Sequence, residues 1–204
     1  MAFQTDFHFV IRKGASPSRP LLLLHGTGGN EHDLIGLAEA VAPGRTLISP
    51  RGKVLENGMP RFFRRFAEGQ FDEADIRDRA ADLSAFVKGA CVHEALSPPI
   101  ALGFSNGANM AAALLALHPD LLAGAVLLRA MTPFQDMPTF SLHATPVLLV
   151  SGQDDPMIPL AGAKRLASCL TLAGAKLSHE VLPAGHGLTQ TDLTLMGRFL
   201  AAQE

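Results

Sequence analysis

Hydrophobic positions along the chain form short apolar runs that alternate with longer stretches of helical periodicity. The strand-like runs are residues 7–12, 20–24, 46–49, 98–102, 125–128, 146–150 and 176–182. Helical patterns occupy residues 31–41, a stretch within 71–96, and residues 106–117, 160–172 and 188–201. Strands that alternate with helices are typical of a mostly parallel sheet. We therefore expect a single α/β domain over residues 1–204, with a mostly parallel central sheet and helices on both faces.

Two segments depart from a simple amphipathic pattern. Residues 21–24 are consecutive leucines, which favours a strand covered on both faces. Residues 50–70 show no clear period and contain several turn-forming residues, which predicts a long irregular segment. The phenylalanines Phe62, Phe63 and Phe66 within it argue against disorder. No long insertion follows residue 105, so we expect no large lid domain.

Composition and charge narrow the class of protein. Apolar residues make up 48% of the 204 residues and charged residues 18%, which is typical of a packed globular chain. The net charge is −2 without a basic patch, so we expect no nucleic-acid partner. No apolar run is long enough to cross a bilayer and the first residues lack a secretory pattern, so we expect a cytoplasmic protein without membrane insertion. Cys91 and Cys169 are expected to be free buried thiols, with a single disulfide as the alternative.

The segment Gly103-Phe104-Ser105-Asn106-Gly107 reads G-x-S-x-G. It follows a predicted strand and precedes a predicted helix, which is the setting of the nucleophile elbow in serine hydrolases. This turn lifts the serine hydroxyl above the sheet, so the pattern predicts Ser105 as a nucleophile. The alternative interpretation is a strand-to-helix turn in which Ser105 only caps the helix.

A serine nucleophile requires a base and an orienting acid, which follow it along the chain in the order acid, then base. Asp154 and Asp155 leave the predicted strand at 146–150, and either side chain is a candidate acid. Asp155 precedes Pro156, which favours an extended backbone that fixes its side chain. His186 lies in a glycine-flanked loop after the last predicted strand and is the candidate base, with a helix-start residue as the alternative.

The tetrahedral intermediate of acyl transfer carries an oxyanion that needs backbone N–H donors. The residue after the nucleophile, Asn106, supplies one donor, and we assign the second to Thr27 in the glycine-rich loop at 25–29. His25, His32 and Asp33 lie close in sequence, but no spacing of a known metal motif is present. We therefore expect no metal and no cofactor.

Taken together, these motifs resemble the phospholipase/carboxylesterase family of α/β-hydrolases, which includes acyl-protein thioesterases. The resemblance lies in residues 23–29, 103–108, 152–159 and 184–187 and runs nearly end to end. It implies an α/β-hydrolase fold and ester hydrolysis. In that family the acid is the aspartate before proline, which implies Asp155.

The strongest resemblance is to small bacterial carboxylesterases, some of which are linked to hydroquinone or quinone stress. Residues 49–52, 59–65 and 128–131 carry this likeness. Acyl-protein thioesterases look different across the middle of the chain, so the resemblance implies an ester substrate without naming it.

The sequence therefore predicts a serine carboxylesterase that hydrolyses small or short-chain esters through a Ser-His-Asp triad and an acyl-enzyme. A thioesterase or lysophospholipase-like activity of the same triad is the alternative, followed by a non-catalytic binding protein on a hydrolase scaffold. The expected partner is a small-molecule ester, and a homodimer remains open.

Phe62, Phe63, Met131 and Met157 are candidate substrate-binding residues, with Phe66 beside them. Packing of the phenylalanines in the core is an equal alternative.

Arg61, Arg64 and Arg65 belong to the same segment as these phenylalanines. We expect most of them to lie on a solvated face, with recognition of an anionic substrate as the alternative.

Overall fold

A seven-stranded sheet forms the centre of the computed structural model, which describes residues 3–203. Its strands lie in the order β1-β3-β2-β8-β9-β10-β11. All neighbours pair in parallel except β1, which is antiparallel to β3. The strands are β1 (Phe9–Arg12), β2 (Leu21–Leu24), β3 (Leu47–Pro50), β8 (Ile100–Phe104), β9 (Gly124–Leu128), β10 (Pro146–Gly152) and β11 (Lys176–Leu182). This topology confirms the predicted α/β fold.

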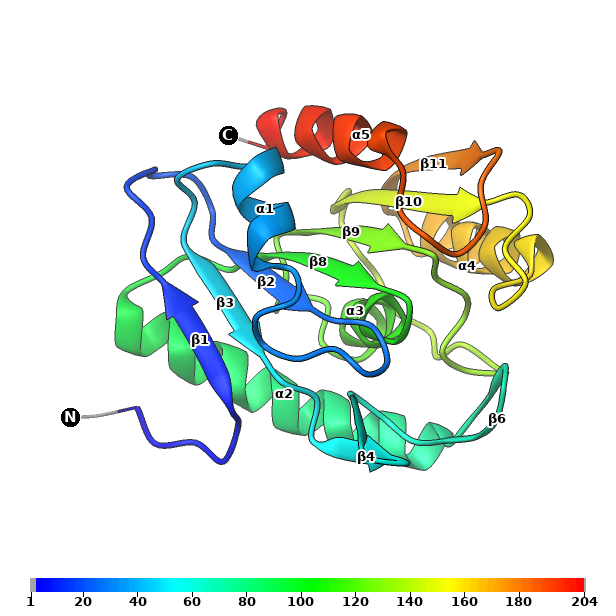
Figure 1. Ribbon diagram of the computed structural model, residues 1–204, viewed down its shortest axis with the longest axis horizontal. Coiled ribbons are helices and arrows are strands. Elements are labelled where there is room, and N and C mark those ends of the chain that lie inside the picture. Colours follow the sequence, from blue (N-terminus) through cyan, green and yellow to red (C-terminus); the bar gives the residue numbers. More distant parts are fainter. Residues whose placement is uncertain (1–2, 204) are drawn as a thin grey trace.

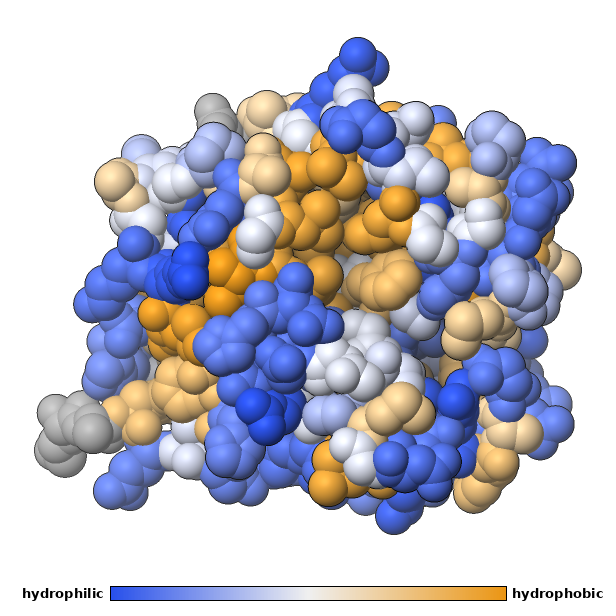
Figure 2. Space-filling view, in the orientation of Figure 1, coloured by the Kyte–Doolittle hydropathy of each residue, from blue (hydrophilic) through white to orange (hydrophobic). Residues whose placement is uncertain are grey.

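Helices cover both faces of the sheet (Figure 1), and in that view α1 and α5 lie in front of it. The helices are α1 (Ile35–Val41), α2 (Glu73–Glu94), α3 (Asn106–Leu117), α4 (Leu160–Leu172) and α5 (Gln190–Ala201). Hydrophobic residues gather around α1 on the face shown in Figure 2, and hydrophilic residues surround them. Among residues 3–203, none of the helices has the length and apolar character needed to cross a membrane.

The leucines of β2 divide between the two layers of the core. Leu22 and Leu24 pack in the cluster that contains α2 and α3, whereas Leu21 and Leu23 pack in the cluster that contains α1 and α5. All four are 0% exposed. Because side chains alternate across a strand, a strand buried on both faces needs an unbroken apolar run, as the sequence predicts here.

Two predicted helices begin later than expected. The helix predicted over 31–41 begins at Ile35, because the side chain of Asn30 accepts a hydrogen bond from the amide of His32 and holds a turn before it. The last helix begins at Gln190, because Thr189 is its N-cap in a capping box with Asp192.

The segment 50–70 is not irregular as predicted but contains two hairpins. They are formed by β4 (Val54–Glu56) with β5 (Met59–Arg61), and by β6 (Arg65–Ala67) with β7 (Gln70–Phe71). Asn57 and Gly58 both have positive φ at the first turn, 52° and 80°. An Asn-Gly pair in this conformation is typical of a two-residue hairpin, so the sequence contained a signal that the prediction missed.

Both cysteines are free, as expected, but they are not fully buried. Cys91 on α2 and Cys169 on α4 each have intermediate exposure. Cys91 packs against the margin of the core cluster that contains α2 and α3.

Candidate active site

Ser105 occupies the sharp turn between β8 and α3 with φ 53° and ψ −114°. Residues other than glycine rarely adopt this backbone conformation, which is strained. The turn also brings strand and helix very close together. A Cβ at Gly107 would lie 2.0 Å from the carbonyl oxygen of Leu24, and one at Gly103 would lie 2.7 Å from that of Gly107. The glycines of the motif are therefore required by the close approach, as the sequence predicts for a nucleophile elbow.

His186 lies between Ser105 and Asp155. Its Nε2 atom is 3.0 Å from Oγ of Ser105, and its Nδ1 atom is 2.8 Å from Oδ2 of Asp155. The other carboxylate oxygen of Asp155 accepts hydrogen bonds from the amides of Met157 at 2.8 Å and Ile158 at 3.0 Å. The acid is thus fixed by the backbone that follows it, and the structure brings together the three side chains that the sequence selects.

Of the two adjacent carboxylates that the sequence left open, Asp155 is buried and Asp154 is exposed. The amide of Asp154 donates to the carbonyl of Ala184 at 3.0 Å, so its backbone supports the loop that carries His186. Of these two carboxylates, it is Asp155 that makes a hydrogen bond to the imidazole.

This arrangement has the geometry of a general base with an orienting acid. With Nδ1 of His186 directed at a carboxylate, Nε2 can accept the proton of Ser105. The three side chains come from the ends of β8, β10 and β11, which lie at the carboxyl edge of the sheet. Sites in open parallel sheets are found at this edge.

The expected oxyanion donors are Asn106, which follows Ser105 in the chain, and Thr27, in the loop after β2, the strand that pairs in parallel with β8. Within residues 3–203, neither the amide of Thr27 nor that of Asn106 donates to another protein group. The next amide along, that of Gly28, donates to the carbonyl of Pro60 at 2.9 Å and so ties the glycine-rich loop to the β4–β5 hairpin. Free N–H groups on a fixed backbone can bind a developing oxyanion.

Arg61 strengthens the same connection. Its Nη1 atom donates to Oγ1 of Thr27 at 2.8 Å, and its Nε atom donates to the carbonyl of Phe63 at 3.1 Å. Arg61 is only 2% exposed, so the expectation of a solvated face is wrong for this residue. A guanidinium group can be buried in a protein when its N–H groups donate hydrogen bonds to protein oxygen atoms, as those of Arg61 do here. Arg61 also pairs with Glu56 at 3.1 Å.

His25 supports the glycine-rich loop from beneath. Its Nδ1 atom is 2.7 Å from the carbonyl oxygen of Gly26, and its Nε2 atom accepts a hydrogen bond from the amide of Gly52 at 3.0 Å. Burial lowers the pKa of His25, which favours the neutral ring. Both ring nitrogens are therefore engaged by backbone and neither is available to bind a metal. Within the described part of the chain, no three His, Cys, Asp or Glu side chains form a metal-binding group.

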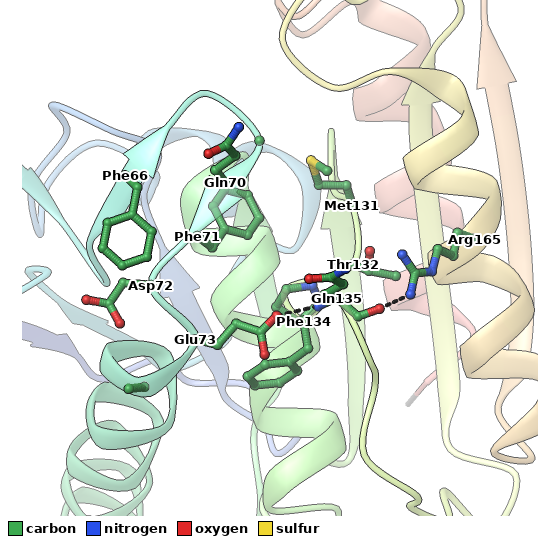
Figure 3. Close-up of a pocket in the computed structure, with 13 residues that line it drawn as sticks. Phe66, Gln70, Phe71, Asp72, Glu73, Met131, Thr132, Phe134, Gln135 and Arg165 are labelled. Atoms are coloured by element: carbon green, nitrogen blue, oxygen red, sulfur yellow. Dashed lines mark hydrogen bonds between the residues drawn. The ribbon is translucent and has the colours of Figure 1, made fainter.

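A cavity of about 720 Å³ lies between the β6–β7 hairpin and the segment that follows β9 (Figure 3). Its lining consists of Phe66, Gly69, Gln70, Phe71, Asp72, Glu73, Ala74, Met131, Thr132, Pro133, Phe134, Gln135 and Arg165. Gln135 accepts a hydrogen bond from Arg165 and donates one to Glu73, and these bonds connect the two sides of the cavity.

The cavity is linked to the elbow through Met131. The amide of Met131 donates to Oδ1 of Asn109 at 2.9 Å, and the amide of Asn109 donates to the carbonyl of Ser105 at 3.0 Å. Asn109, in the first turn of α3, is therefore hydrogen-bonded both to the cavity wall at Met131 and to the strained turn at Ser105.

Only part of the predicted substrate-binding set lines this cavity. Met131 does, and so does Phe66, which is 77% exposed. Phe62 and Phe63 are 3% and 0% exposed and belong to the core, so their assignment to a pocket is corrected. They precede β6 and turn inward before the hairpin, which sequence adjacency to Phe66 does not reveal. Met157 does not line the cavity and lies on the surface two residues after Asp155.

Sequence reasoning missed two charged residues beside the site. Arg129 and Asp192 are both 0% exposed and form a bidentate ion pair. Burial disfavours ionisation of Asp192, but hydrogen bonds from Arg129 and Thr189 outweigh it and hold the pKa of Asp192 below its ordinary value. The available signals were an arginine directly after an apolar strand and an aspartate three residues after a threonine at a helix start.

Comparison with known proteins places these features in a family context. The model of the phospholipase/carboxylesterase family matches residues 5–204. The putative hydrolase MhqD of Bacillus subtilis strain 168 is 42% identical over 183 residues, which cover 89% of this chain and 91% of that protein.

Solved structures give the same result. A carboxylesterase of Bacillus cereus superposes with a TM-score of 0.94 at 40% identity, over 98% of this chain and 95% of that one. A carboxylesterase of Mesorhizobium loti superposes with a TM-score of 0.91 at 30% identity, over 97% of each chain.

Proposed function

Because the chain belongs to the phospholipase/carboxylesterase family and is an esterase enzyme, we propose that it hydrolyses small carboxylic esters through Ser105, His186 and Asp155. The observation that carries this proposal is the unbroken set of hydrogen bonds from Asp155 through His186 to Ser105. Nucleophile, base and orienting acid are recognised by this geometry rather than by their position in the sequence.

In the first half of the reaction, Oγ of Ser105 attacks the ester carbonyl while Nε2 of His186 takes its proton. Asp155 stabilises the imidazolium that forms. The negative charge that develops on the carbonyl oxygen is bound by the amides of Thr27 and Asn106. Collapse of the tetrahedral intermediate breaks the bond to the alcohol oxygen, which takes the proton from His186 and leaves an acyl-enzyme.

In the second half, water enters and His186 removes one of its protons. The resulting hydroxyl adds to the acyl carbon, the same two amides bind the oxyanion, and Ser105 leaves with the proton from His186. The products are a carboxylic acid and the restored enzyme, and every proton is accounted for without a metal or cofactor.

We propose that the cavity near Met131, whose lining includes none of the three triad residues, takes the apolar group of a small substrate. Its volume of about 720 Å³ lies within the range typical of small-molecule sites. Phe66, Phe71, Met131 and Phe134 supply its apolar lining.

We place the enzyme in the cytoplasm, a proposal supported by two cysteines that are unpaired in the described structure.

Labelling with a fluorophosphonate probe tests the proposal, together with hydrolysis of p-nitrophenyl acetate. The wild-type protein should take up the label and turn over the ester, whereas Ser105→Ala should do neither while keeping its circular dichroism spectrum. Ser84→Ala is the matched control, because Ser84 is a buried serine on α2 away from the triad. A folded wild-type protein that takes up no label would instead support a binding protein on a hydrolase scaffold.

A pair of substrates with the same acyl group, one an oxygen ester and the other a thioester, separates esterase from thioesterase activity. The proposal expects the higher kcat/KM for the oxygen ester. A strong preference for the sulfur ester would reassign the substrate class while leaving the roles of the triad unchanged.

A further inference from the structure

His186 lies in a loop that has little stiffness of its own, because glycine flanks it on both sides. We infer that Arg129 is a positioning residue that, together with Asp192, clamps this loop and so holds the imidazole against Ser105. The inference rests on the proposed function, since it assigns a role in the activity of the same site.

The guanidinium of Arg129 grips the loop on both sides of His186. Its Nε atom donates to the carbonyl of Gly185 at 3.0 Å, and its Nη2 atom donates to the carbonyl of Gly187 at 2.9 Å. These two carbonyls bracket the histidine, so the peptide unit before His186 and the one after Gly187 are held by one rigid planar group.

The remaining donors of Arg129 fix the guanidinium itself. Its Nη1 and Nη2 atoms donate to the two carboxylate oxygens of Asp192 at 2.8 and 3.0 Å, and Nη1 also lies 3.4 Å from the carbonyl oxygen of Val150. An arginine side chain has five N–H donors in a fixed fork, and each of them has an acceptor here. No donor remains for solvent, which is consistent with complete burial.

Asp192 anchors the clamp to the start of α5. Its Oδ2 atom accepts hydrogen bonds from the amide of Thr189 at 2.7 Å and from its hydroxyl at 2.8 Å. The capping box of the helix that follows the loop and the clamp on the loop therefore share one carboxylate.

The backbone of Arg129 is adapted to the same role. Its φ is 56°, a left-handed conformation that is uncommon for residues other than glycine. Its amide donates a hydrogen bond to the carbonyl of Val150 at 2.9 Å. The end of β10 also packs closely against the loop, because a Cβ at Gly152 would lie 2.4 Å from the carbonyl oxygen of Gly185. Uncommon backbone geometry of this kind persists only where the surrounding structure enforces it.

A loosened clamp should affect the chemical step more than substrate binding. Arg129 bonds the loop of the base, and its carbonyl partners are not part of the cavity wall. Displacement of a catalytic group by about 1 Å can cost about 10²-fold in rate. The expected signature is therefore a lower kcat with KM close to the wild-type value.

Arg129→Lys is the test variant, because it keeps the positive charge beside Asp192 but offers three donors on a flexible stem instead of five in a fork. Arg45→Lys is the matched control. Arg45 is also buried and donates to backbone carbonyls, those of Leu200 at 2.6 Å and Arg19 at 3.3 Å, and neither of these carbonyls belongs to the loop at 185–187. We expect kcat for p-nitrophenyl acetate to fall about 10²-fold in Arg129→Lys and to stay near wild type in Arg45→Lys.

A spectroscopic measurement separates positioning from general stability. The proton between Nδ1 of His186 and Asp155 should give a low-field proton NMR resonance, identified by its loss in Asp155→Asn. That resonance should broaden or vanish in Arg129→Lys and persist in Arg45→Lys. Should Arg129→Lys fail to fold, Asp192→Asn provides the same comparison, because it weakens the anchor of the guanidinium and leaves the arginine in place.

The inference is overturned if a folded clamp variant retains wild-type kcat, or if kcat falls while the low-field resonance is unchanged. Failure of the proposed function looks different, since the wild-type protein itself would then lack fluorophosphonate labelling and ester turnover. The NMR comparison still decides the role of the clamp in that case, because it does not depend on turnover.

Discussion

Oδ2 of Asp155 lies 2.8 Å from Nδ1 of His186, whereas the carboxylate of Asp154, its neighbour in sequence, is exposed. Asp155→Asn should therefore lower kcat by about 10⁴-fold, because the amide stabilises the wrong tautomer of the imidazole. Asp154→Asn is the matched control and should stay within a few-fold of wild type. Steady-state kinetics with a p-nitrophenyl ester measure both, and the reverse ranking would reassign the acid.

Phe66 and Phe62 provide a second matched pair. Phe66→Ala should raise KM for esters with a bulky apolar group and change the free energy of unfolding by less than about 0.5 kcal/mol, because the side chain is 77% exposed and lines the cavity. Phe62→Ala should instead lower the free energy of unfolding by about 3–5 kcal/mol, because the side chain is 3% exposed in the core. Urea denaturation and a panel of esters of increasing size distinguish these effects. An unchanged KM across the panel in Phe66→Ala would remove the cavity from the substrate site.

Gly107→Ala tests the close approach at the elbow. The added methyl group would lie 2.0 Å from the carbonyl oxygen of Leu24, which is backbone and cannot move without disturbing β2. We expect a marked fall in thermal midpoint, or no folded protein. Gly36→Ala is the control, because nothing lies within 4 Å of the added methyl in α1, and it should stabilise the protein by about 0.5–1 kcal/mol. Equal midpoints in the two variants would contradict the packing described here.

The ion pair of Glu31 with Arg51 predicts a pH dependence of stability. Hydrogen bonding to Arg51 lowers the pKa of Glu31 from 4.5 to about 2. Since the folded-state pKa is the lower one, the stabilisation is present above about pH 4.5 and is lost as the pH falls toward 2. Glu31→Gln should lower the free energy of unfolding by about 1 kcal/mol at pH 7, a small value because Arg51 is partly solvated.

The difference between Glu31→Gln and the wild type should shrink as the pH is lowered from 4.5 to 2. Urea titrations of both proteins at a series of pH values measure it. A difference that is constant over this range would show that the carboxylate does not act through its charge.

The sheet and the meeting of Ser105, His186 and Asp155 were predictable because their signals are local. Four consecutive leucines predict a doubly covered strand, and the glycines around Ser105 and His186 mark turns at strand ends. Parallel strands end at a common edge of the sheet. Motifs that directly follow such strands can therefore be predicted to lie close together, although they are distant in sequence.

The parts that escaped prediction depend on long-range contacts. Phe62, Phe63 and Phe66 are close in sequence, but only the fold of the hairpins decides which of them faces solvent. Arg61 can be buried because the hydroxyl of Thr27, from a distant segment, accepts a hydrogen bond from its guanidinium group. Arg129 can be buried because the carbonyls of Gly185 and Gly187, also from a distant segment, accept hydrogen bonds from its guanidinium group. The periodicity of apolar residues does not indicate where a charged side chain will find its acceptors, so the burial of these two arginines depends on the three-dimensional fold.

The candidate site depends on the intact sheet, because its three side chains follow the parallel strands β8, β10 and β11. Ser105, Asp155 and His186 each leave a different strand, and a gap at any strand pairing would separate them. Turnover should therefore vanish together with the native sheet, at the same denaturant concentration as the loss of ellipticity. The rate at which an ester substrate releases a coloured alcohol would then measure the fraction of folded protein in a preparation.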